Sequence, residues 1–270
     1  MRRLILLFAL MLLFPFIATA QQGDLTRLLR FPDVHMDKVV FVYAGDIWIT
    51  EGNNPTARRL TSHLGMELFP KFSPDGKWIA FSAEYSGTRQ VYVMSVNGGE
   101  VRQLTFYNDV GALPPRGGYD YQILDWTRDG KNVVFRGNRV AWNDRMGRPF
   151  TIPMEGGMET PLVIPESGGG RFSPDGTKFV YTPIERENRT WKRYRGGRAQ
   201  DVWIYDLKAN TTEKITDHIG TDNQPIWIGD NIYFTSDREH TLNIFAYNTK
   251  TKQNRSKFFI LSNYKHSFHF

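Results

Sequence analysis

The sequence predicts an all-β protein built as a β-propeller, with about five four-stranded blades present. Its main sign is a repeated turn. The pentapeptide Phe-Ser-Pro-Asp-Gly occurs at Phe72–Gly76 and Phe172–Gly176, and a related turn lies at Trp126–Gly130. The turn aspartates, at positions 75, 129 and 175, are 54 and 46 residues apart, and a diverged Gly229-Asp230 places the next aspartate 55 residues later. A period of roughly 50 residues with short strands is typical of propeller blades.

Each of these turns has the composition of a tight hairpin connector. Proline presets φ near about −65°, aspartate accepts hydrogen bonds from nearby backbone, and glycine adopts a positive φ at little cost. An aromatic residue precedes each turn, and a lysine and a hydrophobic strand follow it. We therefore assign a structural role, rather than catalysis or calcium binding, to the following turn residues: Asp75, Gly76, Asp129, Gly130, Asp175 and Gly176.

Five segments share one plan. Each opens with a β-branched and aromatic strand, crosses a polar loop, and enters a second strand; most then make a polar turn into a short strand near Leu-Thr or Ile-Thr. These segments begin at Lys38, Lys77, Lys131, Lys178 and Asn231. The alternative is a β-sandwich of some dozen strands, but sandwich turns have no reason to repeat one pentapeptide in register with the rest of a unit.

Loops of unusual length separate some of these strands. Residues 138–150 and 184–200 are long insertions at equivalent positions of two units, so we expect them to project from the same face of the disc. A proline- and glycine-rich loop, Gly111–Tyr121, lies between the second and third units. No helix of useful length is visible.

The first twenty residues predict a secretory signal peptide. Arg2 and Arg3 precede an unbroken apolar run of 14 residues, Leu4–Ile17, and small residues end at Ala20. The run is shorter than the ~20 residues that span a bilayer, and no later segment is apolar enough to span one. The chain contains no cysteine, which excludes a lipoprotein anchor and fits a periplasmic protein without disulfides. We expect an exported protein, periplasmic or secreted, without a membrane anchor after cleavage.

The distribution of charge argues against a nucleic-acid partner. The formal net charge is +6, but two charges belong to Arg2 and Arg3 and three to residues 254–270, which leaves +1 for residues 21–253. Nucleic-acid binding proteins present a basic face. Only one local basic run, around Arg193, could supply such a face.

Three segments carry a resemblance to a known family: Phe31–Trp48, Ala57–Gly65 and Thr190–Leu207. They look like parts of the amino-terminal six-bladed propeller of tricorn-type serine peptidases, and the turns resemble the WD40-like PD40 repeats that this family shares with TolB-like periplasmic proteins. The resemblance implies that about five of six blades are present and that the ring is incomplete. The similarity covers about residues 28–253. We therefore expect three parts: a signal peptide at 1–20, a propeller at 21–253, and a tail at 254–270 outside the family pattern, produced by truncation or frameshift.

The resemblance implies a peptidase that trims oligopeptides, works as a homo-oligomer, and carries its catalytic residues in a carboxy-terminal core. That core, a second propeller and a PDZ domain are absent from these 270 residues. Family members without a signal peptide are cytoplasmic. The resemblance thus implies a chain that is inactive alone and whose partners are oligopeptides and the remaining domains or subunits.

No sequence motif suggests chemistry within the chain itself. There is no GxSxG elbow, HExxH or P-loop. Four histidines are isolated, and the close pair His266 and His269 lies in the tail. We predict no catalytic residue, no metal site and no cofactor.

One basic run is the candidate binding feature. Residues 185–198 interleave arginines and lysine with Trp191 and Tyr194. Arginine suits bidentate capture of carboxylates, so these residues could attract the carboxylate ends of peptides; the alternative is a solvated loop whose arginines pair with neighbouring blades or subunits. The candidate residues are Lys192, Arg193, Arg195, Arg198 and, from the 111–121 loop, Arg116.

Two functions remain open at this stage. The first is the non-catalytic propeller portion of an exported tricorn-type serine peptidase, which acts in peptide passage and assembly. The second is a stand-alone periplasmic propeller of TolB type that works through protein–protein contacts. The basic segment favours the first, and the lack of a catalytic domain favours the second.

Overall fold

The computed structural model describes residues 28–52, 54, 56–107, 121–137, 147–164, 167–184, 194–197 and 199–258. Residues 256–258 are described by their backbone alone. The predicted signal peptide, most of the three long loops, and residues 259–270 lie outside this part of the chain. The described residues form twenty strands and no helix. The prediction of an all-β fold is confirmed.

The strands form five sheets of four, and each sheet is a meander of sequential antiparallel strands. Blade one contains β1 (Arg30–His35), β2 (Lys38–Tyr43), β3 (Asp46–Glu51) and β4 (Arg58–Arg59). Blade two contains β5 (Glu67–Phe72), β6 (Trp78–Ala83), β7 (Gln90–Ser95) and β8 (Val101–Gln103). Blade three contains β9 (Gln122–Trp126), β10 (Asn132–Gly137), β11 (Arg148–Pro153) and β12 (Thr160–Pro161). Blade four contains β13 (Gly169–Phe172), β14 (Lys178–Thr182), β15 (Trp203–Asp206) and β16 (Thr211–Lys214). Blade five contains β17 (Asp222–Ile228), β18 (Asn231–Ser236), β19 (Asn243–Asn248) and β20 (Gln253–Phe258).

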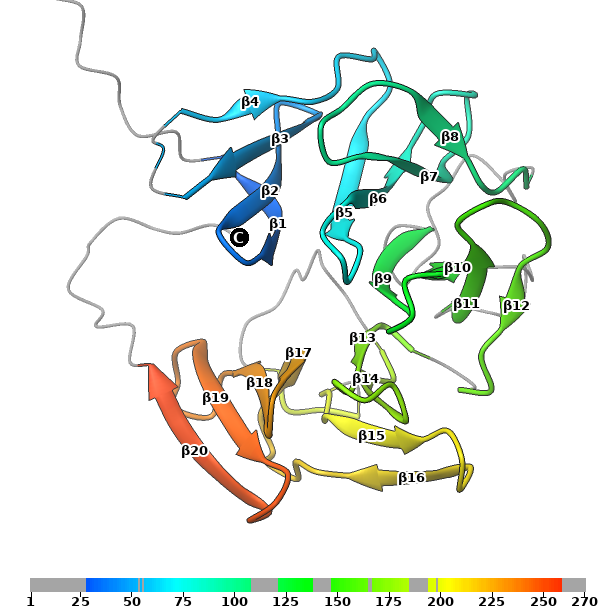
Figure 1. The fold of residues 1–270 in the computed structure, drawn as a ribbon. Coiled ribbons are helices and arrows are strands. Elements are labelled where there is room, and N and C mark those ends of the chain that lie inside the picture. Colours follow the sequence, from blue (N-terminus) through cyan, green and yellow to red (C-terminus); the bar gives the residue numbers. More distant parts are fainter. Residues whose placement is uncertain are drawn as a thin grey trace, which may run out of the picture.

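The blades are arranged radially, and the first strand of each lies nearest the common axis (Figure 1). Four buried apolar clusters lie one at each junction between neighbouring blades, from blades one and two to blades four and five. No hydrogen-bonded pairing joins blade five to blade one among the described strands, and Figure 1 shows the ring open there. The predicted propeller with five blades and an open ring is confirmed.

The repeated turns join the first and second strands of blades two, three and four. In each, the glycine amide donates to the carbonyl of a serine or threonine three residues earlier, at 2.9 Å, and the glycine has a φ of 68° to 74°. Each of these turns lies close to the turn of the preceding blade. A Cβ added to Gly76 would lie 2.3 Å from the imidazole of His35, which is a collision, and a Cβ added to Gly130 would lie 3.8 Å from Pro74, which is an ordinary contact. The turn therefore recurs because each copy lies against the one before it.

The Leu-Thr or Ile-Thr endings have a hydrogen-bonding reason. Hydroxyl oxygens of Thr61, Thr105 and Thr216, which follow the fourth strands of blades one, two and four, accept hydrogen bonds from third-strand amides at 2.8 to 2.9 Å. In blade three the equivalent third-strand residue is Pro149, which has no N–H, and the equivalent of the threonine is Val163. The ending is missing where the backbone has nothing to donate.

The last strand extends beyond the expected end of the propeller. β20 pairs with β19 through Asn254, Arg255, Ser256 and Phe258, so residues 254–258 belong to blade five. We expected no blade after residue 253. The outermost strand of a blade packs against a neighbour on one edge only, and a sequence such as Asn-Arg-Ser-Lys carries little apolar alternation to reveal it.

Candidate functional site

Charged side chains occupy one equivalent position on the innermost strands. In the strand register, this position lies opposite the third residue of the second strand of each blade. It is occupied, in blades one to five, by Asp33, Lys71, Asp125, Arg171 and Ile226. Charge therefore alternates from blade to blade around the axis. We call the four charged residues the axial ring.

Asp33 is the centre of the axial ring. Its Oδ1 accepts from Nζ of Lys71 at 3.1 Å and from Nη2 of Arg171 at 2.7 Å, while its Oδ2 accepts from the amide of Phe72 at 3.0 Å. Its side chain is only 8% exposed. One buried carboxylate thus joins the first, second and fourth blades.

Asp125 repeats this arrangement between blades three and four. Its Oδ2 accepts from the amide of Phe172 at 2.9 Å and pairs with Arg128 of its own blade. In both cases the aspartate of one blade binds the amide of the aromatic residue before the next blade's turn. The arrangement has a two-blade period, with acids in blades one and three and bases in blades two and four.

The electrostatics of the axial ring follow from burial and proximity. Burial alone would raise the pKa of Asp33, but Lys71, Arg171 and the hydrogen bonds to the carboxylate together hold it below its usual value. Burial, reinforced by the nearby Arg171, lowers the pKa of Lys71, although Asp33 opposes this. Burial would lower the pKa of Arg171, but Asp33 and Asp125 raise it overall. Breaking one partner of such a cluster leaves an uncompensated buried charge.

The basic run is described only in part. Lys192, Arg193, Arg198 and Arg116 lie outside the described residues. Arg195 donates from Nη1 to both carboxylate oxygens of Asp237, at 3.1 and 3.0 Å, and Asp237 also accepts from the amide of Thr221. The guanidinium of Arg195 therefore holds the blade-four insertion against blade five.

A buried carboxyl group without a cationic hydrogen-bond partner lies at the first junction. Glu67, fully buried at the start of β5, accepts from the hydroxyls of Tyr85 and Thr61, each at 2.8 Å. Burial is the main cause that raises the pKa of Glu67 to about 7. Burial, together with the hydrogen bond to Glu67, also raises the pKa of Tyr85. His63 lies against the ring of Tyr85, with ring centroids 4.3 Å apart.

Blade five solves the same problem with an ion pair. Asp222 pairs with Ser236, the last residue of β18, and Glu67 pairs with Ala83, the last residue of β6, so the two acids occupy equivalent positions. Arg238 and Tyr85 lie two residues after Ser236 and Ala83 and are therefore equivalent as well. Asp222 accepts from Nη2 of Arg238 at 2.9 and 2.8 Å. Blade two thus carries a titratable neutral pair where blade five carries a charged one.

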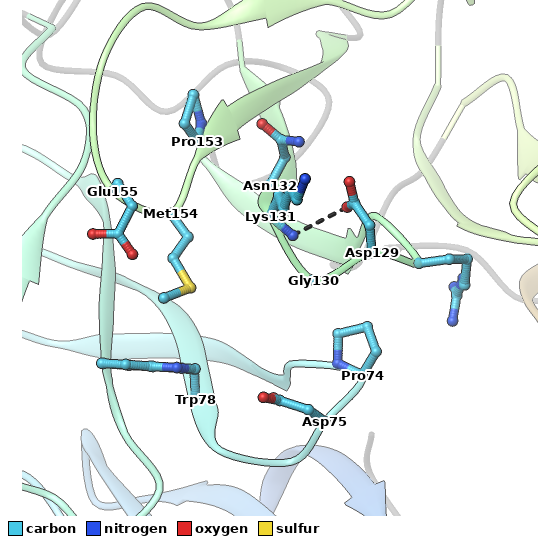
Figure 2. A pocket seen from close by; sticks show the side chains of 11 residues that line it. Pro74, Asp75, Trp78, Asp129, Gly130, Lys131, Asn132, Pro153, Met154 and Glu155 are labelled. Carbon is cyan, nitrogen blue, oxygen red and sulfur yellow. Dashed lines mark hydrogen bonds between the residues drawn. The ribbon is translucent and has the colours of Figure 1, made fainter.

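A groove of about 830 Å³ lies between blades two and three, next to the repeated turns (Figure 2). Trp78, Met154 and Pro153 supply its apolar wall, and Asp75 and Asp129 lie at its turns. The hydroxyl of Ser73 and the amide of Lys77 hold the pKa of Asp75 below its usual value, and Thr127 and Lys131 do so for Asp129. These two carboxylates accept hydrogen bonds within their turns, and Glu155 of the same groove pairs with Arg102 at 2.9 Å.

The described residues contain no group of three or more potential metal ligands, and no helix among them is long and apolar enough to cross a membrane. His63 and His218 each accept, through Nδ1, from the amide of a glycine two residues later, at 2.9 Å. Both histidines are thereby used in loop geometry.

The axial ring was missed from the sequence although a signal was present. Lys71, Asp125 and Arg171 each stand immediately before the aromatic residue of a repeated turn. An alignment of the units on that turn shows the alternation of charge. What the alignment does not show is that residues of blades one and four meet.

Comparison with known proteins gives one family. The protein-family model described as tricorn protease N-terminal beta propeller domain matches residues 26–265. Tricorn protease homolog 1 of Streptomyces coelicolor is 31% identical over 216 residues, which is 79% of this chain and 19% of that protein. A putative tricorn-like protease N-terminal subunit of Sulfurisphaera tokodaii is 24% identical over 184 residues, 67% of this chain and 87% of that protein.

Solved structures agree on the architecture. The crystal structure of the tricorn protease matches with a TM-score of 0.71 and 24% identity, over 86% of this chain and 22% of that one. The structure of a putative TolB from Agrobacterium tumefaciens matches with a TM-score of 0.67 and 18% identity, over 87% of this chain and 82% of that one. At these identities both show the fold alone. The chain spans about a fifth of the length of the first curated relatives it matches.

Proposed function

The chain belongs to the family of the tricorn protease N-terminal beta propeller domain, and from this premise we propose that it is the non-catalytic propeller portion of an exported tricorn-type serine peptidase. In this role it guides oligopeptides towards a catalytic core that these residues do not include, and it takes part in assembly with that core. The family match over residues 26–265 carries the proposal.

The relative from Sulfurisphaera tokodaii supports a separate subunit. The matched region makes up 87% of that protein, whose name describes an N-terminal subunit of a tricorn-like protease. A propeller of this size can therefore be a chain of its own. We propose that the propeller of the present chain assembles with the peptidase core in the same way.

The means of attracting peptides is the basic segment of blade four, together with Arg116 from the loop between blades two and three. Four side chains would attract peptide carboxylates: those of Lys192, Arg193, Arg198 and Arg116. Arginine and lysine bind negatively charged carboxylates, and a focused positive field raises the rate of encounter. Arg195 has a different role, because Asp237 already binds its guanidinium. Export rests on the predicted signal peptide at residues 1–20.

The alternative function is a stand-alone TolB-like propeller that binds other proteins. One observation favours it: the match to the putative TolB covers 82% of that chain, so a protein of similar length with this fold exists without a peptidase core. In that case the chain would bind partners with no link to peptide trimming.

A reconstitution experiment separates the two. The purified chain, without residues 1–20, is mixed with a tricorn-type peptidase from which the amino-terminal propeller has been deleted. The proposal predicts co-elution in size-exclusion chromatography and faster trimming of short peptides than with the deleted peptidase alone. Failure to co-elute, with no change in trimming, would contradict it and favour the TolB-like alternative.

A further inference from the structure

The axis of the propeller is crossed by an ion pair between blades that are not neighbours. Asp33 lies on β1 and Arg171 on β13, the innermost strands of blades one and four, which face one another across the centre of Figure 1. Nη2 of Arg171 nevertheless lies 2.7 Å from Oδ1 of Asp33. Two strands on opposite sides of the ring are therefore joined at the axis itself.

The contact is built into the interior rather than formed at the surface. The side chain of Asp33 is 8% exposed and that of Arg171 is 23% exposed. The second oxygen of Asp33 is held by the amide of Phe72, and the first also accepts from Lys71, so the carboxylate has a fixed position. Charge-assisted hydrogen bonds of this kind are shorter and stronger than neutral ones.

We infer that Asp33 and Arg171 form an axial latch, which holds blade one to blade four across the open ring and closes the axis at this level. Among the described residues, blade one is attached to the ring through its junction with blade two and through this contact. A rotation of blade one away from the axis must break the contact between Asp33 and Arg171. The latch therefore selects a closed arrangement of the blades over an open one.

The latch also bears on the path of peptides, and this consequence rests on the proposed function. A peptide that followed the axis would meet two side chains that come from opposite sides and touch. It passes along the axis only when the latch is broken, and otherwise it follows another route. The latch would then act as a gate on the passage.

The two cations on Asp33 provide a matched test. Arg171→Met removes the contact between blades one and four and leaves Lys71 on the carboxylate, whereas Lys71→Met removes a cation from blade two and leaves the latch intact. The chain contains no cysteine, so Met36→Cys in blade one and Ala209→Cys in blade four give two unique sites for spin labels. Met36 is 88% exposed, and Ala209 lies in an exposed turn. Pulsed electron paramagnetic resonance then reports the distance between the two blades.

The latch predicts a narrow distance distribution in the doubly labelled chain and in its Lys71→Met variant, and a longer or broader one with Arg171→Met. Equal distributions in all three proteins would overturn it, as would equal widening in both variants. Should Arg171→Met fail to fold, Arg171→Lys, which keeps the charge on a different donor, is compared instead. An unchanged distance distribution in Arg171→Lys together with a widened one in Lys71→Met would overturn the latch. No peptide or peptidase is present, so this test and the reconstitution can fail independently.

Discussion

Glu67→Gln is the substitution whose effect the structure predicts most specifically. Glu67 is fully buried, and its carboxyl group accepts from Tyr85 and Thr61 with no cation in hydrogen-bond contact. Burial raises the pKa of Glu67 from the ordinary 4.5 to about 7. Glutamine has nearly the same shape but no proton to lose, so it removes the titration while it keeps the volume.

The size and sign of the effect follow from that pKa. Between pH 4.5 and about 7 the unfolded chain has released the proton of Glu67 while the folded chain keeps it. The folded state then binds more protons, so the stability that the neutral carboxyl contributes is present at low pH and is lost as pH rises. One pKa unit corresponds to about 1.4 kcal/mol, so the full loss above neutral pH is about 3 kcal/mol.

Urea unfolding at a series of pH values measures this directly. The unfolding free energy of Glu67→Gln minus that of the wild type should rise by about 3 kcal/mol from about pH 4 to about pH 8. Glu100→Gln, which removes an exposed carboxylate of the same blade, is the control and should follow the wild type at every pH. Parallel curves for wild type and Glu67→Gln would refute the reasoning, because they would show that Glu67 has the same pKa in both states.

Further predictions concern the same blades. Tyr85→Arg places in blade two the cation that blade five has, so the pKa of Glu67 should fall and the loss of stability between pH 4.5 and about 7 should disappear from the same urea series. Gly76→Ala should destabilise by about 2–4 kcal/mol and Gly130→Ala by about 1 kcal/mol in thermal or urea unfolding, because both have a positive φ but only the first collides with a ring; equal losses would contradict this. Thr105→Val should cost about 1–3 kcal/mol in the same measurement, because a buried amide loses its acceptor. The isolated chain should aggregate on heating, because no buried apolar cluster of the described residues covers the faces of blades five and one at the opening; a sharp, reversible melt of a monomer would contradict this.

The architecture was predictable because it is written locally. Turns such as Phe72–Gly76 combine a hydroxyl, an aspartate and a glycine within five residues, and each is needed for one dihedral angle or one hydrogen bond. Strand alternation supplied the rest of each unit. β20 continues five residues past the expected end of the propeller; this strand was not recognised because it is polar and its pairing with β19 depends on backbone hydrogen bonds.

The interior polar groups were not predictable in the same way. Asp33 and Arg171 are 138 residues apart in sequence, and their contact depends on the curvature of the whole ring. Arg195 was placed among residues that attract peptides, and nothing near it in sequence indicates that Asp237, 42 residues later, binds it. In the sequence, Glu67 looks like an ordinary polar residue at the start of a strand. Its raised pKa results from burial that arises only when blades one and two pack together.

A peptidase assay on the purified chain, without residues 1–20, tests the central claim most directly. The chain is incubated with short fluorogenic peptides, alone and with the propeller-deleted peptidase. The account predicts no hydrolysis above the buffer blank by the chain alone, and accelerated hydrolysis in the mixture. Hydrolysis by the chain alone that co-purifies with it and is abolished by substitution of one of its own side chains would contradict the account.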